Sequence, residues 1–296
     1  MVIVIGLLVE GYFLAKRYSD DVEQEKINQE KINEVEKDKL MNPKDDSLKE
    51  NDNVNNDLEV NINENNKNIS NSEQNTVKDS NISSKLELKS LGNLQYYLYT
   101  PSNPKEGMPL IMYLHGGTNK RATVTELLTA DGFPKYLSDG YYGDLRAYVV
   151  IPKLDNKYMG WADIATDLRN LIKNINTNYK IDMNKISLTG HSMGGTGTYQ
   201  LQVKLPNTFC GIAPMSGSIK NTADNINGLS NAKVWAFVGS EDTIVNPNSL
   251  REIIAALKEK GVDARITEFP SATHFDVPAL GYKNNELINW LVNCSK

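Results

Sequence analysis

Residues 185–197 read KISLTGHSMGGTG, and this stretch decides the fold of the chain around it. Its first half is an apolar run with the composition of a buried strand, and its second half is rich in small residues that begin a helix. Between the two halves, residues 190–194 match the pattern G-x-S-x-G, which is weak evidence by itself. A strand, a sharp turn at Ser192 and a helix form the context in which this pattern exposes a serine at the top of a sheet.

Apolar runs alternate with helical patterns on both sides of this motif. The runs interpreted as strands lie at 94–100, 109–115, 147–154, 211–218, 233–240 and 264–270, and the helical patterns lie at 122–138, 162–179, 248–260 and 284–292. Apolar strands separated by helices predict a mostly parallel sheet with helices on both faces. We therefore expect one α/β domain over residues 85–296. The short spacing of the last strands leaves no room for a large cap domain.

An apolar segment begins the chain. Residues 1–17 are apolar up to Ala15, apart from Glu10, and end in two basic residues. Fifteen helical residues extend about 22 Å, which is short of the roughly 30 Å hydrocarbon core of a membrane, and no basic stretch precedes the apolar part. We interpret the segment as a membrane anchor or signal-like sequence, which places the domain outside the cytoplasm. Lys16 and Arg17 oppose that orientation, because positive charge tends to stay inside.

A polar segment follows at residues 18–84. It is rich in Asn, Lys and Glu and contains no aromatic side chain after Tyr18. Such a segment buries too little apolar area to offset the entropy of ordering its chain, so we predict a disordered tether. The expected organisation is an anchor or signal, a tether and one folded domain, which is either secreted or held at a membrane.

Composition excludes several classes of protein. The net charge is −5 and the isoelectric point is near 5.4, so nothing predicts the basic surface of a nucleic-acid-binding protein. We expect no metal and no cofactor, because HExxH, CxxC, GxGxxG and Walker patterns and carboxylate clusters are missing from the sequence. Cys210 and Cys294 are the only cysteines, which excludes a disulfide scaffold, and whether they pair depends on their distance.

We predict that Ser192, exposed at this turn, is a catalytic nucleophile. A serine nucleophile needs a histidine base, and the chain has three histidines. His115 and His191 belong to glycine-containing motifs. His274 follows the strand predicted at 264–270, and the carboxyl ends of parallel strands share one edge of the sheet. We therefore predict that His274 is the base for Ser192.

An acid that orients the base should lie between Ser192 and His274 in the chain. Glu241 and Asp242 both follow the strand predicted at 233–240. Either carboxylate would hold the imidazole tautomer and stabilise the imidazolium. We favour Asp242 and keep Glu241 as the alternative.

The negative charge that develops on a substrate carbonyl needs backbone N–H donors. One is the N–H of Met193, at the start of the helix that follows the nucleophile, where the helix dipole also favours an anion. The loop after the strand at 109–115 supplies the second donor in this arrangement, from Gly117 first and Gly116 second. We interpret His115 as a residue that braces this loop.

Residues 94–292 resemble the α/β-hydrolase superfamily, and within it the compact serine esterases of the polyhydroxybutyrate depolymerase-like, feruloyl-esterase-like and predicted-peptidase group. The stretches that carry the resemblance are HGG at 115–117, GHSMGG at 190–195, GSEDTIV at 239–245, and His274. In that group the third stretch reads G-x-x-D-x-x-V, which assigns the acid to Asp242. The resemblance implies a serine hydrolase with a Ser-His-Asp triad and an oxyanion hole. It would cleave a carboxylic ester, small or polymer-linked, through an acyl-enzyme.

Candidate substrate-binding residues are Tyr158 and Trp161, after the strand at 147–154, and His191 beside the nucleophile. The two aromatic residues are equally well explained as structural residues at a helix start. One alternative to an esterase is a serine peptidase of the prolyl-oligopeptidase type, which shares the fold and the triad. Another is a non-catalytic tethered binding domain. The sequence leaves open the acyl group, the alcohol and the oligomeric state.

Overall fold

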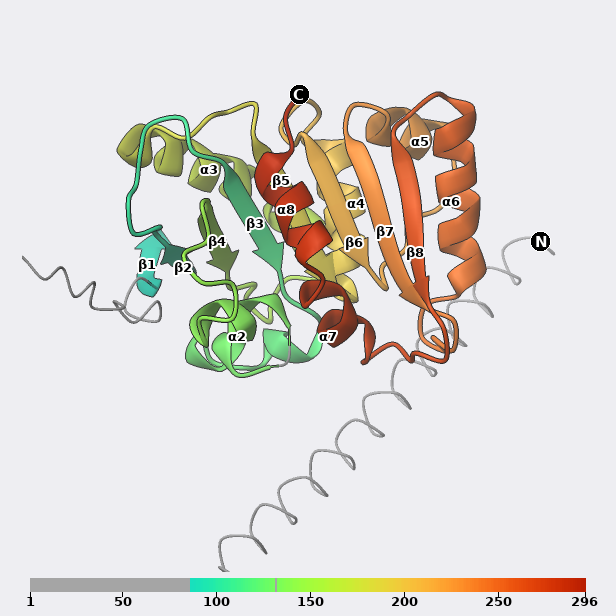
Figure 1. The fold of residues 1–296 in the computed structure, drawn as a ribbon, viewed down its shortest axis with the longest axis horizontal. Coiled ribbons are helices and arrows are strands. Elements are labelled where there is room, and N and C mark those ends of the chain that lie inside the picture. Colours follow the sequence, from blue (N-terminus) through green and yellow to red (C-terminus); the bar gives the residue numbers. More distant parts are fainter. Residues whose placement is uncertain (1–85, 131) are drawn as a thin grey trace, which may run out of the picture. The chain divides into compact units, whose positions relative to one another are not determined.

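The computed structural model describes residues 86–130 and 132–296, and one eight-stranded sheet runs through them (Figure 1). The strands are β1 Leu86–Leu91, β2 Leu94–Tyr99, β3 Leu110–Leu114, β4 Tyr148–Pro152, β5 Ile186–His191, β6 Gly211–Met215, β7 Lys233–Gly239 and β8 Ala264–Phe269. Their order across the sheet is β1-β2-β4-β3-β5-β6-β7-β8. β2 pairs antiparallel with β1 and with β4, and every pair from β4 to β8 is parallel. The predicted mostly parallel sheet is confirmed.

Both faces of the parallel strands are buried, which explains their uninterrupted apolar sequences. In β3, Leu110, Met112 and Leu114 pack into the core on one face of the sheet. Ile111 and Tyr113 pack into the core on the other face. Successive side chains of a strand point to opposite faces, so a strand covered on both sides shows no polar alternation. β1 is an edge strand with exposed positions, and its sequence did not predict a strand.

Helices cover both faces of the sheet, as expected. The helices are α2 Phe133–Ser138, α3 Ala165–Tyr179, α4 Met193–Lys204, α5 Ala223–Leu229, α6 Pro247–Glu259, α7 Val277–Tyr282 and α8 Asn285–Asn293, with short 3-10 helices η2 Thr118–Lys120, η3 Thr125–Leu128 and η4 Trp161–Ile164. α3, α4, α5 and α6 add side chains to the core on one face, and α2, α7 and α8 add side chains to the core on the other. Figure 1 shows α8 crossing in front of the sheet. In the described chain, α5 alone lies between β6 and β7, and α6 alone lies between β7 and β8.

The region predicted as one helix at 122–138 is not continuous. It contains η3 and α2, which are separated at Gly132 by a backbone φ of 147° that favours glycine. A Cβ at Gly132 would lie 3.7 Å from the hydroxyl of Tyr113, an ordinary contact, so the backbone angle and not the space favours glycine here. The helical period continues on both sides of the glycine, and period alone therefore did not reveal the break.

The predicted anchor at 1–17 and tether at 18–84 lie outside the described residues, as does the boundary between the tether and the domain. Within residues 86–130 and 132–296, no helix has both the length and the apolar character needed to cross a membrane. Cys210 and Cys294 are buried free thiols.

Candidate active site

Ser192 lies at the turn between β5, which ends at His191, and α4, which begins at Met193. Its backbone has a φ of 56° and a ψ of −117°, a conformation that costs on the order of 1–3 kcal/mol for a residue with a side chain. The Ser192 N–H donates to the Met215 carbonyl on the neighbouring strand at 2.9 Å, which holds the turn in place. The strained turn leaves Ser192 partly exposed at the carboxyl edge of the sheet.

Glycines on both sides of Ser192 let the turn pack against β3. A Cβ on Gly194 would lie 2.0 Å from the Leu114 carbonyl oxygen, and a Cβ on Gly190 would lie 2.6 Å from the same atom. Because both distances are shorter than any real contact, α4 can begin this close to β3 only with glycine at these positions. Close packing of backbone on backbone therefore requires the small residues of the motif.

His274 and Asp242 form a buried hydrogen-bonded pair. His274 follows β8, Asp242 follows β7, and His274 Nδ1 lies 2.9 Å from Asp242 Oδ2 and 3.1 Å from Oδ1. Asp242 Oδ1 also accepts the backbone N–H groups of Ile244 at 3.0 Å and Val245 at 2.8 Å. Burial raises the pKa of the Asp242 carboxyl, but the hydrogen bonds from His274 and Val245 outweigh burial and hold the pKa below its usual value. The carboxylate is therefore ionised at neutral pH.

The alternative acid, Glu241, has an exposed side chain, and its backbone N–H donates to the Ala272 carbonyl at 3.0 Å. Asp242, and not Glu241, is the carboxylate that contacts His274.

Ser216 is a neighbour of Asp242 that the sequence did not single out. It is fully buried, has a φ of 43°, and follows directly after β6. Its hydroxyl helps to lower the pKa of Asp242, although it does not have the geometry of a full hydrogen bond. The sequence predicted a strand that continues to residue 218, which would place Ser216 inside the strand. A residue inside the strand would not be expected to contact Asp242, which lies in the loop after β7.

The loop after β3 passes within contact distance of the turn at Ser192. A Cβ on Gly116 would lie 3.7 Å from Ser192 Cβ, and a Cβ on Gly117 would lie 4.0 Å from Met193 Cβ. The structure therefore brings Gly116, Gly117 and Met193 together around Ser192.

His115 braces this loop, as interpreted from the sequence. It is fully buried, its Nε2 accepts the Leu154 N–H at 3.0 Å, and its Nδ1 donates to the Gly116 carbonyl at 2.8 Å. Burial lowers the pKa of His115 to about 4, so the ring is neutral and both nitrogens are used in hydrogen bonds.

Of the two interpretations of Trp161, its burial favours the structural residue at a helix start over a substrate contact. Trp161 is fully buried, its Nε1 donates to the His115 carbonyl at 3.1 Å, and its ring lies 4.8 Å from the His115 ring between centroids. A Cβ on Gly197 of α4 would lie 2.7 Å from the Trp161 side chain, so Trp161 fills the space between α4 and the β3 loop. Tyr158 is half-buried and packs against the same core, and its predicted contact with substrate stays a prediction.

His191 is half-buried, and its Nε2 lies 2.9 Å from the backbone carbonyl oxygen of His274. One of the two ring nitrogens of this candidate substrate-binding residue is therefore already in a hydrogen bond with the loop that carries His274.

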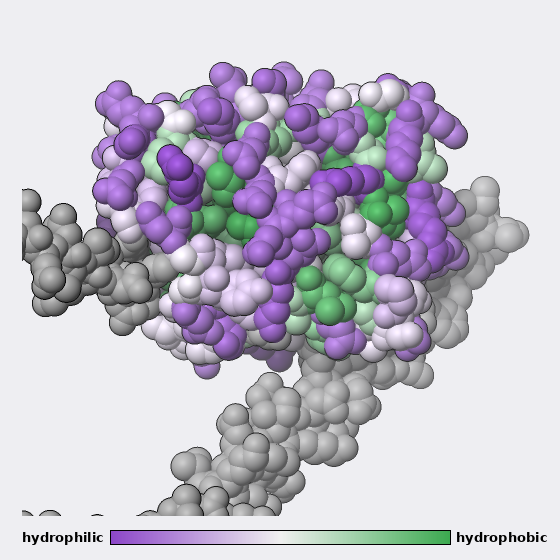
Figure 2. Space-filling model, viewed as in Figure 1, coloured by the Kyte–Doolittle hydropathy of each residue, from purple (hydrophilic) through white to green (hydrophobic). Residues whose placement is uncertain are grey.

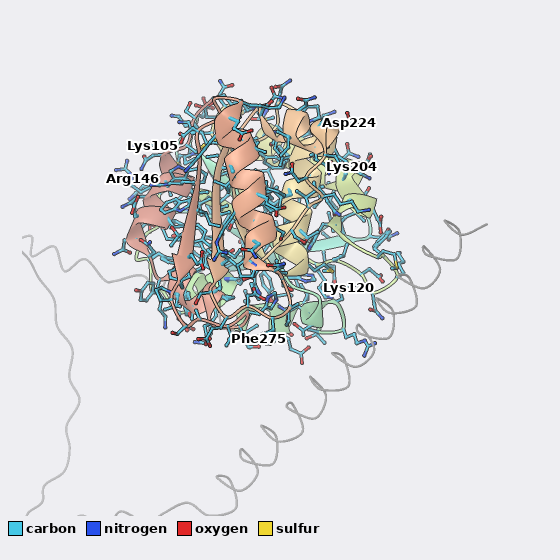
Figure 3. The ribbon with its side chains drawn as sticks, turned by 90° about the vertical axis from the view of Figure 1, so that its right-hand side faces the viewer. Lys105, Lys120, Arg146, Lys204, Asp224 and Phe275 are labelled. Atoms are coloured by element: carbon cyan, nitrogen blue, oxygen red, sulfur yellow. The ribbon has the colours of Figure 1, made fainter. Side chains whose placement is uncertain are left out.

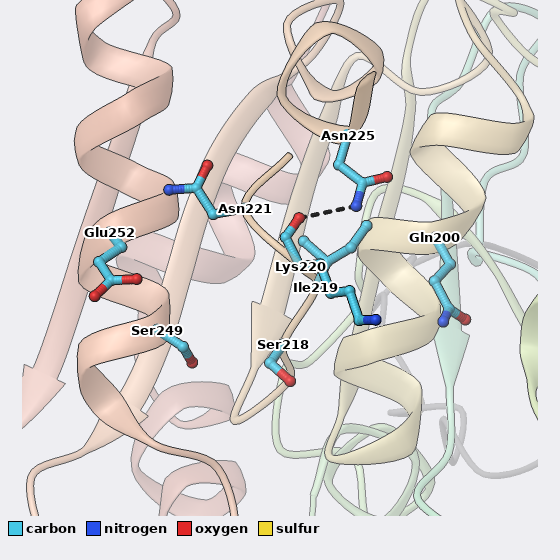
Figure 4. A pocket seen from close by; sticks show the side chains of 8 residues that line it. All are labelled: Gln200, Ser218, Ile219, Lys220, Asn221, Asn225, Ser249 and Glu252. Atoms are coloured by element: carbon cyan, nitrogen blue, oxygen red, sulfur yellow. Dashed lines mark hydrogen bonds between the residues drawn. The ribbon is translucent and has the colours of Figure 1, made fainter. Parts of the chain in front are cut away.

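A pocket of about 600 Å³ lies between α4, α6 and the loop after β6 (Figure 4). Its lining residues are Gln200, Ser218, Ile219, Lys220, Asn221, Asn225, Ser249 and Glu252. Ser192, Asp242 and His274 do not line it, so this pocket is separate from the candidate active site. Within the described chain, no group of three His, Cys, Asp or Glu side chains is placed to hold a metal ion.

Comparison with known proteins identifies the family. Residues 94–281 match the model of the dienelactone hydrolase family, which is well over half of the chain. The chain belongs to the dienelactone hydrolase family. The family and the names of its relatives point to a hydrolase of the esterase type.

Two curated relatives of this family member are larger proteins. This chain is 29% identical over 140 residues to the poly(3-hydroxyalkanoate) depolymerase C of Paucimonas lemoignei. The matched region covers 43% of this chain and 32% of the relative. The chain is 26% identical over 163 residues to the bifunctional acetylxylan esterase/xylanase of Neocallimastix patriciarum, which covers 51% of this chain and 22% of the relative. The match thus spans no more than 32% of either relative.

A solved structure of a thermostable esterase has a TM-score of 0.61, with 73% of this chain and 64% of that chain covered. The sequence identity is 21%, so this likeness shows the α/β-hydrolase fold alone.

Proposed function

We propose that this member of the family hydrolyses a carboxylic ester through an acyl-enzyme formed on Ser192. The observation that carries the proposal is the buried pair of His274 and Asp242, which follows strands that end at the same sheet edge as β5. An ionised carboxylate at Nδ1 fixes the imidazole tautomer whose Nε2 is free to take a proton. The chain has three histidines, all of them described, and only His274 has a carboxylate at hydrogen-bond distance.

In the proposed reaction, Ser192 Oγ attacks the carbonyl carbon of the ester while its proton passes to His274 Nε2. The N–H groups of Met193 and Gly117, with Gly116 beside them, stabilise the negative charge on the carbonyl oxygen. The alcohol leaves with the proton from His274, and the acyl group stays on Ser192. A water molecule then attacks the acyl group, His274 takes its proton and returns it to Ser192 Oγ, and the carboxylic acid is released.

Exposed apolar side chains support an extended substrate with an apolar part. Met159, Ile244 and Phe275 are 88%, 49% and 59% exposed, and they lie in the loops after β4, β7 and β8. The three loops follow parallel strands, so they lie at the sheet edge that also carries Ser192. Figure 3 shows Phe275 at the same end of the molecule as Lys120, which follows β3. Figure 2 shows hydrophobic side chains over α7, the helix that follows Phe275 in the chain.

Two of these residues adjoin the proposed catalytic residues. Phe275 follows His274 directly, and the N–H of Ile244 binds Asp242 Oδ1. The relatives named above are a poly(3-hydroxyalkanoate) depolymerase and an acetylxylan esterase/xylanase. We propose a polymer-linked ester as the substrate class of this chain as well.

A panel of substrates tests the proposal. It contains short p-nitrophenyl esters, feruloylated and acetylated glycans, a polyhydroxyalkanoate film and X-Pro amides. We expect turnover of esters by the wild type and a loss of several orders of magnitude in Ser192→Ala, whose circular dichroism spectrum should match that of the wild type. Turnover of p-nitrophenyl acetate by Ser192→Ala at a rate near that of the wild type would reject Ser192 as the nucleophile.

The same residues would also serve a serine peptidase, because the attack on an amide uses the same nucleophile, base and oxyanion donors. The discriminating measurement is the ratio of kcat/KM for an X-Pro amide to kcat/KM for an ester of the same acyl group. We expect the ester to be preferred, and a preference for the amide would favour the peptidase.

A further inference from the structure

We propose that His191 is a positioning residue that holds the backbone of His274, and thereby ties the loop that carries the base to the turn that carries the nucleophile. His191 directly precedes Ser192, so it belongs to the same turn. The inference rests on the proposed function of Ser192 and His274, and it replaces the expectation that His191 binds substrate.

The contact that supports this role joins residues 83 positions apart in the chain. His191 Nε2 donates to the His274 carbonyl oxygen at 2.9 Å, and the two ring centroids are 4.7 Å apart. Asp242 meanwhile holds the His274 ring at Nδ1. His274 is therefore held at two points. Asp242, in the loop after β7, binds its ring, and His191, the last residue of β5, binds its backbone carbonyl.

The other hydrogen bonds of this loop do not reach β5. Ser271 N–H donates to Ser240 Oγ at 2.8 Å, and the Ala272 carbonyl accepts the Glu241 N–H at 3.0 Å, so these residues tie the loop to the region after β7. Thr273 N–H donates to Asp276 within the loop at 2.8 Å. Among these bonds, the bond from His191 alone sets the distance between the base and the strand that carries Ser192.

A neutral imidazole suits this position. Burial lowers the pKa of His191 to about 3, so the ring has one N–H, and the hydrogen bond to His274 places it on Nε2. A positive charge this close to His274 would oppose the imidazolium that forms during the reaction. The other ring nitrogen, Nδ1, lies near the loop after β3. A Cβ on Gly116 in that loop would lie 4.0 Å from His191 Nδ1.

Two variants of equal polarity test the proposal. In His191→Gln the amide nitrogen reaches about as far as Nε2, whereas in His191→Asn it reaches only about as far as Nδ1. We expect His191→Gln to keep kcat for p-nitrophenyl acetate within about threefold of the wild type. We expect His191→Asn to lower kcat about tenfold or more while KM changes less than about twofold, because a small misplacement of the base slows the chemical step. Labelling of Ser192 by a fluorophosphonate should slow in parallel.

Equal kcat values for the two variants would overturn the proposal. A rise in KM with an unchanged kcat in both variants would also overturn it, because that pattern belongs to a residue that binds substrate. If thermal melting shows that His191→Asn does not fold, His191→Met takes its place, since it fills a similar volume without a donor. An inactive wild type, or an active Ser192→Ala, would instead refute the proposed function, so the two failures are distinguishable.

Discussion

Replacing Asp242 with Asn tests the assignment of the acid directly, because the change removes a charge but almost no volume. Asp242 Oδ1 accepts the N–H groups of Ile244 and Val245, and both carboxylate oxygens lie within 3.1 Å of His274 Nδ1. Asn keeps one acceptor oxygen for the two backbone N–H groups, so its NH₂ group faces His274 Nδ1. Nδ1 must then accept a hydrogen bond, the ring proton moves to Nε2, and Nε2 can no longer take the proton of Ser192.

We expect kcat of Asp242→Asn to fall on the order of 10⁴-fold, which is the effect of the wrong tautomer in Ser-His-Asp enzymes and corresponds to about 5.5 kcal/mol in the activation free energy. KM should change little, because Asp242 is buried and contacts His274. The matched control is Glu241→Gln, whose exposed side chain should affect kcat less than about threefold. Steady-state hydrolysis of p-nitrophenyl acetate measures both variants. A larger loss in Glu241→Gln, or more than about a tenth of wild-type kcat in Asp242→Asn, would refute the reasoning.

The same substitution should change how stability depends on pH. The folded protein holds the pKa of Asp242 below its usual value of about 3.9. The stability contributed by this carboxylate is therefore fully present above the unfolded pKa and is lost as the pH falls through the folded pKa. The difference in urea midpoint between the wild type and Asp242→Asn should shrink as the pH falls from about 5 to about 3. A difference that stays constant over this interval would contradict the depressed pKa.

Three further outcomes are expected. Ser192→Gly should lose turnover but gain roughly 1 kcal/mol in the free energy of unfolding, because glycine adopts a φ of 56° and a ψ of −117° without strain. A lower melting temperature than that of the wild type would argue against stored strain at this turn. Phe275→Ser should raise KM for p-nitrophenyl esters of long acyl chains by about threefold to tenfold and leave the acetate unchanged, whereas equal changes for both esters would exclude a contact with the acyl chain. A chain that begins at Ser84 should match the full chain in kcat and KM, because every proposed catalytic residue lies beyond residue 86. We propose that residues 1–17 govern membrane association or secretion instead. Their removal should therefore shift the protein to the soluble fraction.

The placement of the candidate site was predictable from the topology. Ser192, Asp242 and His274 each follow a strand, and the strands β5, β7 and β8 are parallel members of one sheet. The carboxyl ends of such strands share an edge whatever the details of their side chains. The sequence therefore predicted that residues far apart in the chain lie together, and the hydrogen bond between His274 and Asp242 agrees with that prediction.

Side-chain environment was not predictable in the same way. Trp161 follows a strand end, where aromatic residues often meet a ligand, yet it is buried between His115 and Gly197. The hydrogen bond from His191 to His274 depends on the path of a loop 83 residues away. A local sequence pattern predicts the helix or strand to which a residue belongs. The burial of its side chain and the partners of its hydrogen bonds depend on how distant elements pack together, and a local pattern carries no information about that packing.

Residues at or near the ends of parallel strands hold the proposed catalytic residues in place. The Ser192 N–H is held by the Met215 carbonyl at the end of β6, the His274 ring by Asp242 after β7, and the His274 backbone by His191 at the end of β5. Met215, Asp242 and His191, which make these attachments, each lie within three residues of the end of a parallel strand. The strand ends therefore hold the residues that we propose as nucleophile and base. The exposed side chain of Phe275 makes none of these hydrogen bonds, but its ring lies 5.3 Å from the His274 ring between centroids. We therefore expect substitution of Phe275 to alter the preference for acyl group or polymer while the hydrogen bonds that hold His274 remain.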